Sequence, residues 1–380
     1  MDPLPLLADL VAFDTTSSRS NLPLIDFVSG YLDKHGIASR TVPDATGEKA
    51  SLLATIGPAA DGGVVLSGHT DVVPVTDQPW TADPFSLTRR DDRLLGRGTA
   101  DMKGFIACVL AMAPMLNART LRVPVHLAFS YDEEVGCLAA PALIEALLAD
   151  GRRPAFAIVG EPSEMRVCNR HRGIHTYRTT VTGRPGHAGA PARGANAIAA
   201  AAECVTLLTR LGEGALADDP DVPEVTSVNV GRIEGGTAVN IIAGRCHFAW
   251  ECRPGPDDAA ARVRDVLEAH ARDVLLPAIR ARAPDAHLET EEIVAVPPLR
   301  IDEGAFVQVL AMEFAGQQRP PAAVPFASEA GLFQAAGVPA VVVGPGSPAQ
   351  AHQPDEFVTI AQLDACMEFL GRLADWATEN

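Results

Sequence analysis

Apolar residues in the first part of the chain form short runs with segments of helical periodicity between them. The runs at 64–71, 125–130 and 156–160 are typical of buried strands. Helical patterns precede or separate them, at 3–13 and after a turn within 130–150. This alternation predicts an α/β fold, with a mostly parallel sheet and helices on both faces.

The pattern changes at about residue 174. The alternation that follows is typical of strands with one exposed face, and two segments have helical periodicity. The predicted order is strand 176–182, helix 195–210, strands 226–233 and 245–253, helix 259–274 and strand 287–296. This βαββαβ order indicates a ferredoxin-like unit. The apolar run 340–344 then returns to the pattern of the first part.

Histidines and acids recur where the apolar runs end. His69 and Asp71 close the first run, the pair Glu133 and Glu134 follows the second, and Glu161 follows the third. Residues two apart in a strand face the same way, so Asp71 can hold the ring of His69 in one tautomer.

Two further candidate ligands lie in glycine-containing segments. Asp101 lies in Gly-Arg-Gly-Thr-Ala-Asp-Met-Lys-Gly, and His352 follows Gly-Pro-Gly-Ser near the C-terminus. Mixed carboxylate and imidazole donors without cysteine suit zinc, cobalt or manganese.

Each of these residues alone has an ordinary structural explanation. A single histidine or aspartate at a strand end is usually a cap, turn or surface residue, and an acidic pair usually starts a solvated helix. The segment around Asp101 lacks the third glycine of a dinucleotide fingerprint and the Gly-Lys-Ser/Thr ending of a P-loop, which excludes nucleotide binding there. Recurrence at the carboxyl ends of successive strands favours a ligand site instead.

The motifs also resemble those of a known family. The order His-Thr-Asp, Gly-Arg-Gly-Thr-Ala-Asp-Met-Lys-Gly, Asp-Glu-Glu-Val-Gly, Gly-Glu-Pro and Ala-His is similar to the co-catalytic zinc deacylases and peptidases. That family contains acetylornithine deacetylase, succinyl-diaminopimelate desuccinylase and several carboxypeptidases. The likeness extends over nearly the whole chain and implies hydrolysis of a linear amide.

The resemblance implies roles for the candidate residues. Asp101 would bridge two zinc ions, His69 and Glu161 would complete one site, and Glu134 and His352 the other. Asp71 would orient His69, Glu133 would be the general base, and the peptide bond after Asp101 would be cis. Since ligands come from both sides of the ferredoxin-like unit, we expect a discontinuous metal-binding domain of residues 1–173 and 297–380, and an inserted domain of 174–296.

The inserted domain contributes three candidates through the resemblance. His187 would reach from a partner subunit to the scissile carbonyl and stabilise the oxyanion, which implies a homodimer with a shared site. Asn240 and Arg253 would hold polar groups and the carboxylate of the substrate. Without the resemblance, His187 is a polar turn residue, and Asn240 and Arg253 are surface residues at strand ends.

Three local features favour Nα-acetyl-L-ornithine, an intermediate of arginine biosynthesis, as the substrate. The segment around His171 and the tail from 344 to 357 resemble the deacetylase version of the family. Glu329 is an acid that could pair with the side-chain ammonium of ornithine, or could be an exposed glutamate at a helix start. N-succinyl-diaminopimelate, acetylcitrulline and a dipeptide remain alternative substrates, and a catalytically silent binding protein remains an alternative of another class.

Composition limits the partners and the compartment. The formal net charge of −17 argues against binding to nucleic acid or to anionic membranes. The sequence has no positively charged leader and no apolar stretch that could span a bilayer, which predicts a cytoplasmic protein. The seven cysteines, without a C-x-x-C pair, indicate reduced, buried thiols.

Overall fold

The computed structural model describes residues 2–149, 151–215, 226–254 and 259–379. The chain divides into two compact units. The first comprises 1–170, 299–324 and 328–380, and the second comprises 171–298 with 325–327. Their designation as a metal-binding domain and a dimerisation domain stays a prediction.

A mixed nine-stranded sheet forms the centre of the first unit, in the order β1-β2-β6-β3-β7-β17-β8-β15 with β16 beside β8. The four central strands β6, β3, β7 and β17 run parallel, whereas β1, β2 and β8 pair antiparallel with their neighbours. The strands are β1 Ser39–Pro43, β2 Ala50–Ile56, β3 Val64–His69, β6 Val125–Ser130, β7 Phe156–Val159, β8 Cys168–His171, β15 Leu299–Arg300, β16 Ala322–Val324 and β17 Ala340–Val342. The predicted fold class is therefore confirmed.

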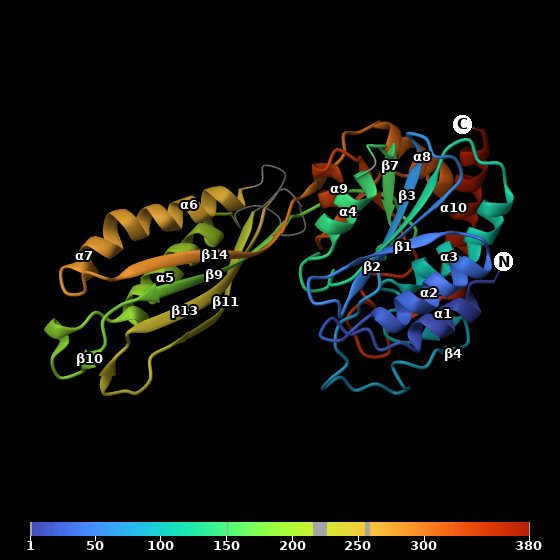
Figure 1. The fold of residues 1–380 in the computed structure, drawn as a ribbon. Helices are drawn as coiled ribbons and strands as arrows, with labels where there is room; N and C mark the ends of the chain where they lie inside the picture. Colours follow the sequence, from blue (N-terminus) through green and yellow to red (C-terminus); the bar gives the residue numbers. More distant parts are fainter. Residues whose placement is uncertain (1, 150, 216–225, 255–258, 380) are drawn as a thin grey trace. The chain divides into compact units, whose positions relative to one another are not determined.

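Helices lie on both sides of this sheet. Figure 1 shows α4 and α9 on one side and α3 and α10 on the other. The helices are α1 Leu4–Val11, α2 Leu22–Lys34, α3 Lys103–Ala118, α4 Ala140–Leu148, α8 Phe306–Ala315, α9 Glu329–Ala335 and α10 Ile360–Glu379. Helix α3 packs against β3 and α10 and is buried over almost its whole length, as expected of a helix that is apolar all round.

A smaller sheet joins two distant segments of the first unit. Strand β5, Arg93–Leu95, pairs antiparallel with both β4, Thr88–Arg90, and β18, Phe357–Thr359. This pairing holds the segment that leads to Asp101 beside the segment that follows His352.

The second unit has the predicted βαββαβ order. Its four long strands pair antiparallel in the order β11-β13-β9-β14, which is the ferredoxin-like arrangement. The elements are β9 Ile174–Thr182, α5 Ala197–Ala215, β11 Ser227–Gly235, β13 Arg245–Arg253, α6 Ala260–His270, α7 Leu276–Arg280 and β14 His287–Val296, with the short pair β10 Gly186–His187 and β12 Ile241–Ile242. Tyr177 and Trp250 stack in its core, with ring centroids 4.3 Å apart.

Several predicted boundaries are wrong; helix α5, for example, ends at Ala215 and not at residue 210. The strand predicted at 64–71 ends at His69. The helix predicted at 259–274 continues through a π-helical segment, Ala271–Leu275, into α7. Pro277 does not stop it, because proline is accommodated in the first turn of the renewed helix. The helix predicted within 130–150 is α4, and residue 150 lies outside the described residues.

All seven cysteines are free and buried, as predicted. Over the ranges that the structure describes, no helix is both long and apolar enough to cross a membrane.

Candidate metal centre

His69 ends β3 and is only 1% exposed. Its Nδ1 lies 2.9 Å from the backbone oxygen of Asp71 and 3.5 Å from Oδ1 of the same residue. A carbonyl oxygen only accepts, so Nδ1 donates to it, and Nε2 is the ring nitrogen that faces Asp101 and Glu161. The strand ends at His69. Of the two Asp71 oxygens near the ring, the backbone carbonyl is the closer one, so Asp71 orients the ring mainly through this carbonyl.

The carboxylate of Asp71 holds the acidic pair in place. It accepts hydrogen bonds from the backbone N–H of Glu133 at 3.1 Å, the N–H of Glu134 at 3.3 Å, and the Ser17 hydroxyl at 2.7 Å. Burial alone would raise the pKa of Asp71, but contacts with His69 and Ser17 lower it overall. Asp71 thus remains an anion that links the end of β3 to the loop after β6.

Asp101 lies between the two histidines. Its Oδ1 is 2.9 Å from Nε2 of His69, and its Oδ2 is 3.3 Å from Nε2 of His352. The same His352 nitrogen is 2.9 Å from Oε2 of Glu134. The peptide bond between Asp101 and Met102 is cis, which confirms that expectation. One carboxylate thus reaches both halves of a single cluster.

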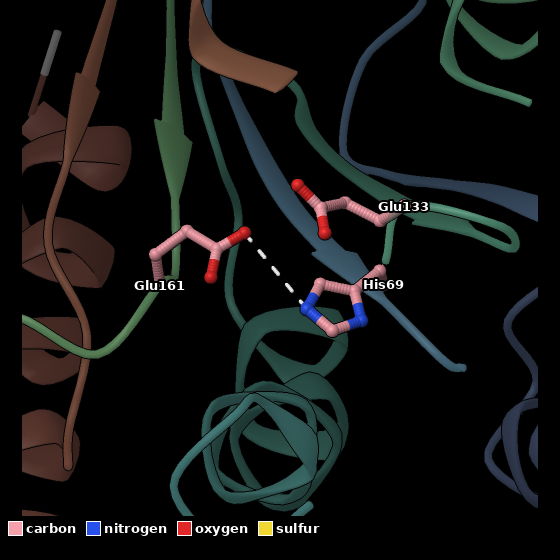
Figure 2. Close-up of side chains that lie close together, drawn as sticks. All are labelled: His69, Glu133 and Glu161. Atoms are coloured by element: carbon pink, nitrogen blue, oxygen red, sulfur yellow. Dashed lines mark ion pairs between the residues drawn. The ribbon is translucent and has the colours of Figure 1, made fainter. Parts of the chain in front are cut away.

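Glu133 and Glu161 lie on another side of His69. Figure 2 shows both carboxylates close to the imidazole ring, and Oε1 of Glu161 is 3.9 Å from its Nε2. Donor atoms of His69, Glu133 and Glu161 all lie within 4.8 Å of one another, as do those of His69, Asp101 and Glu134. The first unit therefore brings together all seven predicted ligand and acid–base residues of the centre.

The electrostatics of the cluster suit divalent cations. Burial, together with repulsion between neighbouring carboxylates, raises the pKa of Glu133, Glu134 and Glu161. Oε1 of Glu161 is buried and has no hydrogen-bond partner among the described residues. Bound cations would offset the repulsion and satisfy that oxygen. The imidazole and carboxylate donors therefore fit divalent metal ions.

Three other predicted residues, His187, Asn240 and Arg253, belong to the second unit. His187 and Ile241 pair in the two-stranded sheet of β10 and β12, and the carbonyl of Asn240 accepts from the N–H of Ala188. His187 and Asn240 are both exposed and therefore lie in one exposed region. Arg253 ends β13 and pairs with Glu251 at 3.1 Å. Their roles at the centre stay predictions.

Glu329 belongs to the first unit and starts α9. It is 1% exposed and accepts a hydrogen bond from Ser67 at 2.9 Å, so the alternative of an exposed helix-start glutamate is wrong.

Sequence reasoning missed several buried polar residues around the centre. Ser17 contacts Asp71, and Arg97, Lys103 and Glu356 are each at most 1% exposed. Arg97 and Lys103 flank Asp101 within its glycine-containing segment. These charged residues stand beside glycines and close to a predicted metal ligand, and that position could have indicated a role at the centre. Charged side chains are rarely buried without a specific partner.

Comparison with known proteins agrees with this geometry. Residues 65–376 match the model of peptidase family M20/M25/M40. The chain belongs to this family. It is accordingly a metal-dependent hydrolase of amide bonds. It is 37% identical to an acetylornithine deacetylase of Myxococcus xanthus, over 96% of this chain and 95% of the relative. It is 34% identical to one of Proteus mirabilis, over 96% and 92%.

Solved structures share the fold. An M20 family metallo-carboxypeptidase from Sulfolobus solfataricus superposes with a TM-score of 0.78 at 17% identity, over 100% of both chains. A tripeptidase from Staphylococcus aureus superposes with a TM-score of 0.76 at 19% identity, over 100% of this chain and 98% of that one.

Proposed function

We propose that this enzyme removes the acetyl group from Nα-acetyl-L-ornithine, giving L-ornithine and acetate, in arginine biosynthesis. The reaction class is supported by the carboxylates that surround the imidazole of His69, which include that of Glu133. The substrate is supported by relatives of 32–37% identity over nearly the full chain that are named acetylornithine deacetylase.

The contacts at the centre support an assignment of the metal ligands. We assign His69, Asp101 and Glu161 to one ion, and Asp101, Glu134 and His352 to the other. Zinc is the ion we expect, and cobalt or manganese would suit the same donors. Two such ions, when bound, would polarise the amide carbonyl and lower the pKa of the attacking water toward about 7.

Glu133 is the residue to which we assign proton transfer. As a carboxylate it takes a proton from the attacking water, and as an acid it delivers that proton to the departing amine nitrogen. A bond from the water oxygen to the carbonyl carbon forms, and the carbon–nitrogen bond of the amide breaks.

We assign the second unit to substrate binding and dimer formation. In this proposal the enzyme is a homodimer, and His187 of one subunit donates to the carbonyl oxygen in the site of the other. Asn240 and Arg253 hold polar groups of the substrate. Arg253 would exchange its contact with Glu251 for the substrate carboxylate, to which a guanidinium can donate two parallel hydrogen bonds.

The test is the kcat/KM of the zinc- or cobalt-loaded enzyme for four substrates under identical conditions: Nα-acetyl-L-ornithine, N-succinyl-L,L-diaminopimelate, acetylcitrulline and a dipeptide. We expect acetylornithine to be preferred. The matched control is Glu133→Gln, which should keep its metal and lose activity by a factor of about 10² or more.

Preference for another of the four would overturn the substrate and keep the reaction class. Metal-loaded protein that turns over none of them would favour the silent binding protein.

A further inference from the structure

The two loops that carry Asp101 and His352 are joined by a chain of buried polar contacts. Arg97 and Glu356 are each 1% exposed and form an ion pair, with Nη1 2.6 Å from Oε2. The other carboxylate oxygen of Glu356 accepts from the backbone N–H of Ala100 at 2.9 Å and of Asp101 at 3.1 Å. The ion pair thus fixes the backbone on which the bridging carboxylate stands.

The same guanidinium reaches the His352 loop by a second route. Nη2 of Arg97 donates to Oε1 of Gln78 at 2.6 Å, and Nε2 of Gln78 donates to the carbonyl of His352 at 2.9 Å. The guanidinium also lies 5.1 Å from the ring centroid of Trp80, whose Nε1 donates to Gln78. Gln78 is therefore the link between Arg97 and the backbone of His352.

His352 needs this support more than His69 does. His69 stands at the end of a central strand and is 1% exposed, so its neighbours fix it by packing. The His352 side chain is 51% exposed, and its backbone is in the left-handed region at φ 64°. Contacts to its own main chain must therefore hold it in place.

We propose that Gln78, held by Arg97, is a positioning residue that sets the affinity of the metal site formed by Asp101, Glu134 and His352 through its contact with the carbonyl of His352. The inference rests on the proposed metal assignment. It predicts that loss of the Gln78 link weakens binding of one ion and leaves the other unchanged. Among the described residues, the side chain of Gln78 has hydrogen bonds with Arg97, Trp80 and His352, and none with His69 or Glu161. Ligand-supporting contacts of this kind typically change metal affinity by about 10–100-fold.

The test is calorimetric titration of metal-free protein with Zn²⁺ for wild type, Gln78→Ala and Gln350→Ala. Gln350 is the matched control, because it lies in the same loop as His352 and its side chain makes no hydrogen bond in the part of the chain that the structure describes. We expect two ions in each protein, with one dissociation constant about tenfold higher or more in Gln78→Ala alone. The visible absorption of the Co²⁺-loaded proteins provides a second readout, and should change in Gln78→Ala at the second equivalent only.

A thermal unfolding scan of the metal-free proteins separates positioning from stability. The Tm of metal-free Gln78→Ala should equal that of Gln350→Ala. The inference would be overturned if Gln78→Ala bound both ions more weakly to the same extent, or if its two affinities were unchanged. It would also be overturned if metal-free Gln78→Ala had a lower Tm than metal-free Gln350→Ala. Wild-type protein that binds fewer than two ions would instead contradict the proposed metal assignment.

Discussion

The carboxylate of Glu329 is buried at the start of α9. Ser67 donates to Oε2, while Oε1 is buried without a hydrogen-bond partner among the described residues. Burial raises the pKa of Glu329, although interactions with Ser130 and His69 lower it in part. A cation that approaches a buried acceptor of this kind stabilises it.

This environment gives a residue-scale prediction for substrate selectivity. If Glu329 pairs with the ornithine ammonium, Glu329→Gln should lower kcat/KM for Nα-acetyl-L-ornithine by about tenfold or more, because a charge-assisted contact is lost. The comparison substrate is N-acetyl-L-norvaline, which lacks the ammonium and should be hydrolysed equally by both proteins. An equal loss on the two substrates would show that Glu329 supports the site without contacting the side chain.

At the scale of elements, the loop after β7 is held tightly against α3. A Cβ atom placed on Gly160 would lie 2.1 Å from the Phe105 ring. Helix α3 follows directly from the Asp101 segment, so this contact sets the spacing between β7, which leads to Glu161, and the helix after Asp101.

Gly160→Ala should therefore destabilise the enzyme by about 1–3 kcal/mol through overpacking, with a lower midpoint in urea. Gly371→Ala provides the control. Gly371 lies inside α10 with no atom within 4 Å of the added Cβ, and alanine there should stabilise by about 0.5–1 kcal/mol. Equal midpoints for the two variants would mean that the loop moves away from the helix without cost.

Elements with a regular pattern were the ones that the sequence could predict. Strands β6, β13 and β14 begin and end where the pattern placed them. Short strands such as β8 and β15 exist because neighbours pair with them, and local sequence does not contain that information. The same holds at the centre, where strand ends indicated His69 and Glu161, but Gln78 joins the His352 loop only through tertiary folding.

At the scale of the whole molecule, the proposed homodimer predicts complementation between two inactive chains. In a mixed dimer of Glu133→Gln and His187→Ala, one site combines both substitutions and the other has neither. Co-expression of the two variants should therefore restore roughly a quarter of wild-type activity, because about half of the dimers are mixed and each has one intact site.

The parent variants, assayed separately, supply the baseline, and light scattering gives the mass of the particle. Activity of the mixture no higher than the mean of its parents would place His187 in its own subunit's site or outside the mechanism.

Strand β17 has a consequence for synthesis of the chain. It lies between β7 and β8, yet it is made roughly 170 residues later, after the entire second unit. Until residues 340–342 leave the ribosome, the edges of β7 and β8 that later bind β17 have no partner strand. Unpaired strand edges favour association with other chains, so chaperone protection should matter most for nascent chains that end before residue 340.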